Sequence, residues 1–357
     1  MDARARRRPP GYPGLDLALL SRILVVNAGS TSLKLSLVDE EGGSATVEGF
    51  EAADAVGHRV VHGGARFRDP VRIDEEVVDA IRELSALAPL HNRPALAAIE
   101  EARRALPAVP HVAVFDTAFH ATIPPEAATY AVPARWREEW GIRRYGFHGL
   151  SVAWASERVP ARRLVVCHLG GGCSITAVRD GRSVDTTMGF SPLEGVPMAT
   201  RSGSIDPGAL LYLLRERGLS VDELDRALEH ESGLVGLGGT DDVRRLEGTP
   251  ALDVYVHRIA GAIAAMAASA GGLDALVFTA GVGEGSAWVR EHVCARLGFL
   301  GVELDAAVNR GARADAEISA AGSRVAVHVV RAREELVIAR ATRQLLARGM
   351  TAGRLNQ

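Results

Sequence analysis

The sequence predicts an α/β protein with two similar halves. Two stretches far apart in the chain share one pattern: an apolar strand, a turn rich in glycine or serine, and a second strand. They are residues 23–38 (ILVVNAGSTSLKLSLV) and 164–178 (LVVCHLGGGCSITAV). Clusters of strands followed by helical periodicity occur twice, which is typical of α/β halves with mixed sheets. Glycine in such turns lets backbone N–H groups approach a phosphate. We therefore expect an internal duplication in which each half presents one such turn to a ligand.

Composition limits the classes of protein to which the chain can belong. Its 357 residues suffice for two domains or one large one, and 47% hydrophobic and 24% charged residues are ordinary for a globular protein. A net charge of −3 and an aromatic content of 5% argue against nucleic acid or an anionic membrane surface as a partner. The three cysteines form no CxxC pair, which disfavours disulfides and zinc and favours a reducing, cytoplasmic location.

The chain begins with a basic segment rich in proline and glycine, MDARARRRPPGYPG, which lacks the apolar core of a signal peptide. We expect residues 1–21 to be a disordered extension, or the product of an upstream start codon. Residues 259–270 are rich in alanine but too short and too interrupted by polar residues to span a bilayer, which predicts a buried helix.

Local patterns predict the elements that follow the first hairpin. The apolar run 111–115 (HVAVF) ends at Asp116, a common way to place a carboxylate at the carboxyl edge of a sheet. Proline is favoured at the first position of a helix, so Pro94 is expected to begin one. Strands are expected at 46–50, 58–62 and 111–115, and helices at 74–87 and from Pro94 to Leu106.

In the second half, residues 184–207 form an unusually long loop whose apolar content indicates a function rather than disorder. Asp206 and Pro207 begin a helix that Gly218 ends, and Ser220 with Glu223 forms a capping box. We expect a glycine-rich linker at residues 234–240 (LVGLGGT) and a last strand at 324–330. Helices are expected at 251–270, 287–297, 306–315 and 334–347.

Several turns carry residue types that suit phosphate. Asn27, Ser30, Thr31, Ser32 and Lys34 supply an amide, hydroxyls and a charge for phosphate and Mg²⁺-bound water, although an ordinary β-turn has the same composition. The turn 170–172 is not a Walker A loop, because it lacks the GK[ST] ending and a strand follows it. Residues 281–285 (GVGEG) precede a helix whose N-terminus suits a phosphate, and a tight strand-to-helix connection is the simpler explanation.

Charged residues near glycines are further candidates. Arg59 and Arg201 suit the spread charge of a carboxylate or a transferring phosphoryl group, and His148 is able to donate to such a group. Taken singly, a surface ion pair or an ordinary loop histidine explains each of them better. Glu334 and Glu335 begin the last helix, where the helix dipole alone favours acidic residues.

Nine segments between residues 23 and 343 resemble, in order, the signatures of the acetate kinase family, which includes acetate and propionate kinases. They are VVNAGSTSLK, GHRVVHGG, APLHN, FDTAFH, RRYGFHG, HLGGGCS, MGFSPLEGVPMATRSG, FTAGVGEGS and REELVIAR. The resemblance implies a duplicated ribonuclease H-like fold, the actin-like ATPase fold, with two domains and a central nucleotide cleft. It also implies a first domain of residues 22–116 plus 336–357, and a second of 117–335 that carries most of the nucleotide site.

The resemblance implies reversible, direct in-line phosphoryl transfer from ATP to acetate. Arg59 and Arg201 would clamp the carboxylate and the transferring group, His148 would stabilise its equatorial oxygens, and Asp116 would orient metal and phosphates. Mg²⁺, or alternatively Mn²⁺, would be held largely through water by Asn27 and Glu334. The implied nucleotide site comprises Ser30, Ser32, Lys34, His168, Leu169, Gly170, Gly171, Gly172, Asp242, Val243, Arg244, Gly281, Val282, Gly283, Glu284 and Gly285. The implied acid pocket comprises Arg59, Val61, Leu90, Phe147 and Pro192.

Alternatives to acetate kinase remain open at this point. Gly171 stands where the family usually has asparagine, and HLGGG resembles the turn of butyrate kinases, so a propionate or butyrate kinase is the second reading. Further alternatives are a pyrophosphate-dependent variant, a non-catalytic ATP-binding module and a sugar kinase. Arg59, Arg201 and His148 argue against the ATP-binding module, because binding of a nucleotide alone does not need them. The resemblance also implies a homodimer, with no nucleic acid or membrane partner.

Overall fold

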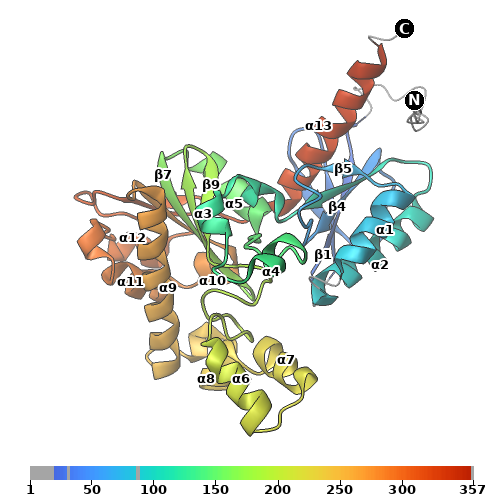
Figure 1. The fold of residues 1–357 in the computed structure, drawn as a ribbon. Coiled ribbons are helices and arrows are strands. Elements are labelled where there is room, and N and C mark those ends of the chain that lie inside the picture. Colours follow the sequence, from blue (N-terminus) through green and yellow to red (C-terminus); the bar gives the residue numbers. More distant parts are fainter. Residues whose placement is uncertain (1–19, 30–32, 86–88, 355–357) are drawn as a thin grey trace.

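The computed structural model describes residues 20–29, 33–85 and 89–354, apart from the side chains of 89–91 and 349–354. It contains two six-stranded sheets, one in each half of the molecule (Figure 1). In order across the sheet, the first comprises β3 (Ser44–Val47), β2 (Leu33–Val38), β1 (Ile23–Ala28), β4 (Ala55–Val60), β6 (His111–Phe115) and β5 (Val71–Arg72). The second comprises β9 (Arg182–Thr186), β8 (Cys173–Arg179), β7 (Arg163–Leu169), β10 (Ala275–Thr279), β12 (Ala326–Val329) and β11 (Ala316–Glu317).

The two sheets have the same topology. Read in these orders, each begins with two antiparallel pairs, continues with two parallel pairs and ends with an antiparallel pair. The predicted hairpins are the second antiparallel pair of each sheet, with Asn27 opposite Lys34 in one and His168 opposite Ser174 in the other. The predicted internal duplication and the α/β class are therefore confirmed.

Helices cover both faces of the first sheet. Successive side chains of a strand point to opposite faces, so Leu24 and Val26 pack with α2 (Pro89–Ala105) while Ile23 and Val25 pack with α13 (Glu334–Arg354). The helix α1 (Glu75–Leu84) lies beside α2 (Figure 1), and Asp74 caps it by accepting a hydrogen bond from the N–H of Val77.

The second sheet lies between α9 (Pro250–Ala270) and α5 (Gly149–Arg158). Leu150 of α5 also packs with Ile338 of α13, so these two helices join the sheets. Among the described residues, α9 is the one helix long and apolar enough to cross a membrane. Half of that stretch is buried, including Ile259 and Ile263 against the second sheet, so the predicted buried helix is confirmed.

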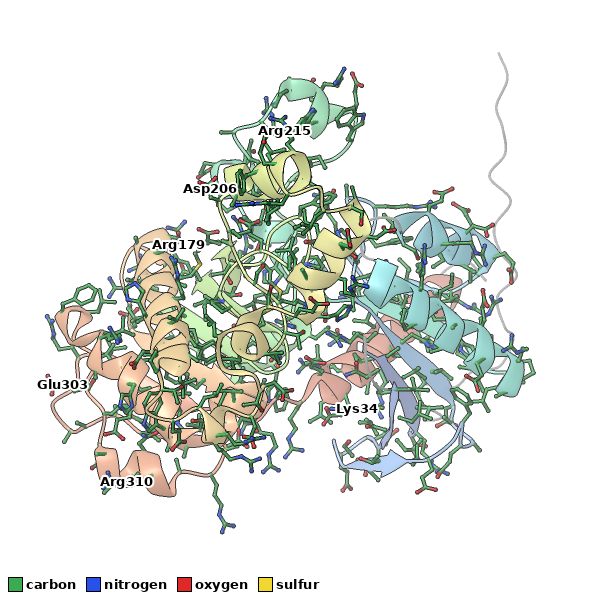
Figure 2. The ribbon with its side chains drawn as sticks, turned by 90° about the horizontal axis from the view of Figure 1, so that it is seen from below. Lys34, Arg179, Asp206, Arg215, Glu303 and Arg310 are labelled. Carbon is green, nitrogen blue, oxygen red and sulfur yellow. The ribbon has the colours of Figure 1, made fainter. Side chains whose placement is uncertain are left out.

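A helical lobe projects from the second half and consists of α6 (Pro207–Glu216), α7 (Val221–His230) and α8 (Gly233–Gly238) (Figure 1). Asp206 and Arg215 mark the two ends of α6 (Figure 2). Asp206 caps α6 and the capping box of Ser220 and Glu223 begins α7, as predicted. The remaining elements are α3 (Pro125–Ala128), α4 (Ala134–Glu138), α10 (Ala280–Gly285), α11 (Ala287–Ala295), α12 (Ala306–Gly311), and 3₁₀ turns at Ala118–Thr122, Val243–Arg245 and Gly298–Leu300.

The prediction that Pro94 begins a helix is wrong, because α2 already begins at Pro89 and contains Pro94. A tertiary contact accounts for the earlier start: the amide of Asn92 accepts from the N–H of His62 at 3.0 Å and donates to its carbonyl at 3.0 Å. This pair holds the first turn of α2 against the end of the first sheet.

The predicted linker at 234–240 is also wrong, since 233–238 form α8. The N–H groups of Leu234 and Val235 donate to the carbonyls of Met198 and Ala199, which holds the glycine-rich segment in a helix. Residues 281–285 precede the helix α11, as predicted, and themselves form the short helix α10.

Two boundaries also differ from expectation. The disordered extension expected over residues 1–21 is wrong for its last two residues, because Leu20 is buried and the carbonyls of Leu20 and Ser21 accept from Arg343; residues 1–19 lie outside the described part of the chain. The strands expected at 46–50 and 58–62 lie at 44–47 and 55–60.

Candidate active site

Residues from both halves surround a cavity of about 370 Å³. The predicted residues that line it are Arg59, Val61, Asp116, Phe147, His148, His168, Gly171, Gly172, Pro192, Arg201 and Glu334. Arg59 and Asp116 stand at the carboxyl ends of the neighbouring parallel strands β4 and β6, which explains why they meet. The structure therefore brings together all four predicted catalytic residues, which are spread over more than 140 positions of the chain.

Arg59 is the centre of a polar network. Its Nε lies 3.0 Å from Oδ2 of Asp116, and its Nη1 lies 3.1 Å from Oδ1 of Asn27. The Nδ2 of Asn27 donates to Oε2 of Glu334 at 3.1 Å. Burial works against ionisation of Glu334, but the positive charge of Arg59 outweighs it and lowers the pKa of the carboxyl. Burial raises the pKa of Asp116, although Arg59 opposes that rise.

Two histidines are stacked at the wall of the cavity. The rings of His148 and His168 lie 3.9 Å apart at an interplanar angle of 15°. Nδ1 of His148 is 3.0 Å from the hydroxyl of Ser174, and Nδ1 of His168 is 2.8 Å from that of Ser151. Burial lowers the pKa of His168 to about 4, and burial together with the positive charges nearby lowers the pKa of His148 as well. Both rings are therefore neutral at pH 7.

His148 and Arg201 face one small space. A Cβ added at Gly172 would lie 3.2 Å from Nε2 of His148 and 3.4 Å from Nη1 of Arg201. Glycine at 172 thus leaves a gap between a hydrogen-bond donor and a positive charge. His148 itself has a φ of +59°, a left-handed conformation that is uncommon outside glycine and that directs the ring at the start of α5.

An apolar wall closes one side of the cavity. Val61, Phe147 and Pro192 are buried and line it. The side chain of Leu90, the fourth apolar residue expected there, lies outside the described residues. A small apolar wall beside two arginines suits a short carboxylic acid.

Comparison with known proteins identifies the family. The sequence model of the Acetokinase family matches residues 44–340. The chain belongs to the acetokinase family. It is 48% identical to the acetate kinase of Nostoc punctiforme over 86% of this chain and 80% of that protein. It is 50% identical to the acetate kinase of Gloeobacter violaceus over 83% of this chain and 77% of that protein.

Solved structures show the same fold. The acetate kinase of Porphyromonas gingivalis superposes with a TM-score of 0.80 at 34% identity, over 91% of this chain and all of that one. The propionate kinase of Francisella tularensis superposes with a TM-score of 0.82 at 35% identity, over 90% and 98%. The chain is therefore a kinase with the two-domain α/β fold of these acetate and propionate kinases, as the resemblance implied.

The other predicted nucleotide residues that the structure describes do not line the cavity. Ser30 and Ser32 lie outside the described residues, and Lys34 is exposed on β2 (Figure 2). Asp242 and Arg244 are paired at the surface, 2.8 Å from Oδ1 to Nε. Leu169 and Val243 are part of the core of the second half.

The glycine-rich helix α10, which contains predicted residues 281–285, is anchored from behind. Arg290, which is buried, donates to the carbonyls of Gly283 and Glu284 at 2.9 and 2.8 Å. The carboxylate of Glu284 accepts from the N–H of Ala332, two residues before Glu334. These bonds tie α10 to the segment that brings Glu334 into the cavity.

Several residues of the site were missed by the sequence reasoning. Glu194 accepts from Nη2 of Arg144 at 3.0 Å and from the hydroxyl of Tyr130, and Arg144 also donates to the carbonyls of Thr186 and Thr187. This network holds the loop that carries Pro192 and Arg201. Arg144 and Glu194 lie inside the quoted motifs RRYGFHG and SPLEG, which was the available signal.

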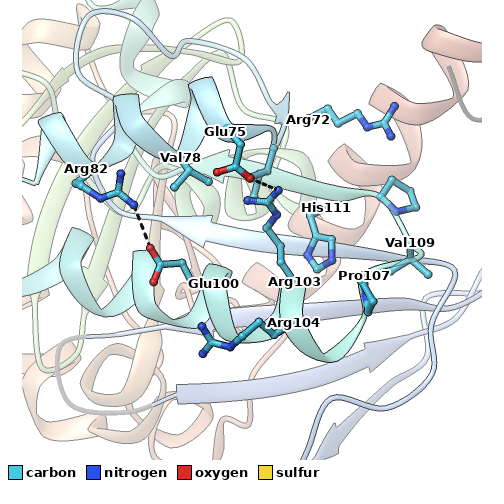
Figure 3. Close-up of a pocket in the computed structure, with 12 residues that line it drawn as sticks. Arg72, Glu75, Val78, Arg82, Glu100, Arg103, Arg104, Pro107, Val109 and His111 are labelled. Carbon is cyan, nitrogen blue, oxygen red and sulfur yellow. Dashed lines mark hydrogen bonds and ion pairs between the residues drawn. The ribbon is translucent and has the colours of Figure 1, made fainter. Parts of the chain in front are cut away.

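A second cavity, of about 480 Å³, lies against α1, α2 and β6 (Figure 3). None of the predicted site residues lines it. Two of its four arginines have acidic partners: Arg82 lies 3.2 Å from Glu100, and Arg103 lies 2.8 Å from Glu75 (Figure 3). Paired surface arginines of this kind are ordinary, and we assign this cavity no function.

Proposed function

We propose that this protein is an acetate kinase, which transfers the γ-phosphoryl group of ATP reversibly to the carboxylate of acetate and forms acetyl phosphate and ADP. The observation that carries the proposal is the cavity in which Arg59, His148 and Arg201 meet an apolar wall. Two arginines offset the repulsion between two anions, and the small apolar wall accommodates a methyl group. The names of the relatives support the same reaction.

The mechanism follows from charge. A carboxylate is ionised at neutral pH, so its attack needs no general base. A carboxylate oxygen forms a bond to the γ-phosphorus while the bond to the bridging oxygen of ADP breaks on the opposite side. Arg201 and Arg59 stabilise the charge on the acid and on the equatorial oxygens, and neutral His148 donates a hydrogen bond from Nε2.

The residues at the cavity fit a divalent cation. Within the described chain, Oδ1 of Asp116 is buried and makes no hydrogen bond, and Glu334 and Asn27 add a carboxylate and an amide oxygen nearby. No group of three or more His, Cys, Asp or Glu side chains suited to a metal occurs among the described residues. A site with only a few protein oxygen ligands suits Mg²⁺ or Mn²⁺, because Mg²⁺ keeps several of its bound water molecules in such a site. When bound, the cation neutralises phosphate charge.

We propose that ATP and ADP occupy the cleft between the halves, along the turn 168–172 and the segments 242–244 and 281–285. The anchoring of α10 by Arg290 supports this placement, because it presents a rigid backbone. We assign residues 22–116 and the C-terminal helix from 336 onward to the first domain and 117–335 to the second. The packing of Ile338 with β1 supports that division.

We further propose a cytoplasmic homodimer. Buried, unpaired cysteines support a reducing compartment: Cys167, Cys173 and Cys294 are all free. The helix α6 supports an interface, since all its residues are described and none is fully buried. Leu211 and Tyr212 on this helix are each 47% exposed, an apolar face of the kind that subunit contacts cover.

The alternative within the family is a propionate or butyrate kinase. The likeness to the propionate kinase of Francisella tularensis supports it, although the acetate kinase structure matches about as well. A module that only binds nucleotide has no use for Arg59, Arg201 and His148 at one cavity.

The test is Mg·ATP-dependent phosphorylation of acetate, propionate and butyrate side by side, with acyl phosphate trapped by hydroxylamine. We expect turnover to be highest with acetate and to fall at least about 100-fold in Arg201→Ala. A maximum at propionate or butyrate would select the alternative. Tight ATP binding without acyl phosphate from any acid would contradict the kinase proposal.

A further inference from the structure

The helix α7 buries a charge where a helix is least suited to one. Among its ten residues, all of which the structure describes, Glu229 alone is buried. It lies in the last turn, where the negative end of the helix dipole opposes a carboxylate. Burial of an ionised group is also costly unless a partner compensates it. The stability of α7 therefore does not explain the glutamate.

The partner is an arginine of the proposed active site. Nε of Arg201 lies 2.8 Å from Oε2 of Glu229, and the two side chains are only 13% and 10% exposed. Since Nε faces Glu229, the outer end of the guanidinium extends into the cavity, where Nη1 is 3.4 Å from the position of a Cβ on Gly172. The carboxylate thus forms an ion pair with one edge of Arg201, and Nη1 at the other edge faces the cavity, where it also lies 3.5 Å from the carbonyl oxygen of Pro192.

The backbone around this pair is fixed separately. The hydroxyl of Thr200 donates to the carbonyl of Glu229 at 2.7 Å, and the N–H of Ser202 donates to the carbonyl of Leu228 at 3.1 Å. The N–H of Ser232 donates to the carbonyl of Thr200 at 3.0 Å. Because main-chain bonds already attach this segment to α7, the Glu229 carboxylate adds control over the direction of the Arg201 side chain.

We propose that Glu229 is the positioning residue of Arg201, holding its guanidinium through Nε so that the Nη groups meet the oxygens of the anionic substrate. This inference rests on the proposed function, in which Arg201 binds the acid and the transferring phosphoryl group. Glu229 itself touches no substrate. Substitution of Glu229 acts through Arg201 alone.

The test compares Glu229→Gln, Arg201→Ala and the double variant in the hydroxylamine assay with acetate and Mg·ATP. Glu229→Gln keeps the shape and removes the charge, and we expect kcat/KM for acetate to fall about 10- to 100-fold, as for other residues that orient a functional side chain. In the Arg201→Ala background the same change should lower kcat/KM for acetate less than about twofold, because the guanidinium that Glu229 orients is no longer present. The matched control is Glu231→Gln, two residues after Glu229. It breaks an exposed ion pair with Arg226 and should leave activity unchanged.

A second measurement does not depend on activity. In protein labelled with ¹⁵N-arginine, the Nε–H signal of Arg201, identified by its loss in Arg201→Lys, should shift in Glu229→Gln because the adjacent carboxylate charge is removed. Equal losses of activity from Glu229→Gln with and without Arg201, full activity of Glu229→Gln, or an unchanged Nε–H signal would overturn the inference. If the unmodified enzyme makes no acyl phosphate, the proposed function fails, and the signal still decides whether Glu229 orients Arg201.

Discussion

At the residue scale, the site includes two glycines, whose lack of a side chain leaves space in the cavity. Gly171 and Gly172 both line the cavity, yet their surroundings differ. A Cβ at 172 would crowd His148 and Arg201, whereas a Cβ at 171 would meet nothing within 4 Å. The two glycines are therefore a natural pair for testing whether the gap is required for activity.

We predict that Gly172→Ala lowers kcat/KM for acetate at least about tenfold, because the methyl group displaces Nε2 of His148 or Nη1 of Arg201. Misplacement of reacting groups by an ångström costs up to about 100-fold. Gly171→Ala is the control and should stay within about threefold of the parent in the same assay. Equal effects of the two substitutions would show that the gap at 172 has no special role.

The second residue-scale prediction concerns the proton on His148. Nδ1 of His148 faces the buried hydroxyl of Ser174, which has no other hydrogen bond within the part of the chain that the structure describes. A buried hydroxyl proton without an acceptor is unfavourable, so Ser174 donates to Nδ1 and leaves the ring proton on Nε2. Only that tautomer donates into the cavity.

Ser174→Ala should therefore lower kcat about 10- to 100-fold, as loss of an orienting partner of a functional histidine does. The measurement is single-turnover formation of acyl phosphate, accompanied by ¹⁵N shifts of the His148 ring that report the tautomer. Ser156→Ala, which removes a hydroxyl that only bonds the carbonyl of Val152 in α5, is the control. An unchanged tautomer in Ser174→Ala would contradict the assignment.

At the element scale, the sequence predicted those features that depend on local pattern. Both hairpins, the cap at Asp206 and the capping box at Ser220 follow from a few adjacent residues, and the structure has them as predicted. The start of α2 and the helix α8 were not predictable in this way. Their conformations depend on bonds from Asn92 to His62 and from Leu234 to Met198, residues that are far apart in the sequence.

The same distinction applies to the site. Arg59, Asp116 and His148 lie in motifs that resemblance singles out, and the structure brings them together. Glu229 lies in no quoted motif, and its signal is only that an acidic residue occupies the last turn of an amphipathic helix. A residue that acts through another residue leaves little trace in a single sequence.

The element-scale prediction concerns α10. Arg290 is 1% exposed and satisfies the carbonyls of Gly283, Glu284 and Asn309. Arg290→Ala leaves buried carbonyls without donors, and we expect the free energy of unfolding in urea to fall by about 3–5 kcal/mol. KM for ATP should rise in the folded fraction, since α10 loses its support. Arg296→Ala, at the exposed position directly after α11, should change neither quantity. A destabilised variant with unchanged KM for ATP would remove α10 from the proposed nucleotide site.

At the scale of the whole molecule, three buried histidines, His62, His120 and His168, link stability to pH. His120 is buried within the second half, with Nδ1 2.9 Å from the hydroxyl of Ser183 on β9 and Nε2 donating to the carbonyl of Phe147 at 2.9 Å. Burial lowers the pKa of His120, His62 and His168 to about 4 in each case. In the unfolded chain each has a pKa near 6.5.

These pKa differences predict how stability depends on pH. Between pH 6.5 and about 4 the unfolded chain binds protons that the folded chain excludes, so the free energy of unfolding falls as the pH is lowered through this window. Each histidine contributes up to about 1.4 kcal/mol per pH unit, and above pH 7 the contribution is constant because both states are neutral. Urea unfolding at pH 7.5, 6.5, 5.5 and 5.0 measures the slope. His120→Gln should reduce that slope by about one proton, whereas a slope unaffected by the substitution would mean that His120 is protonated in the folded protein.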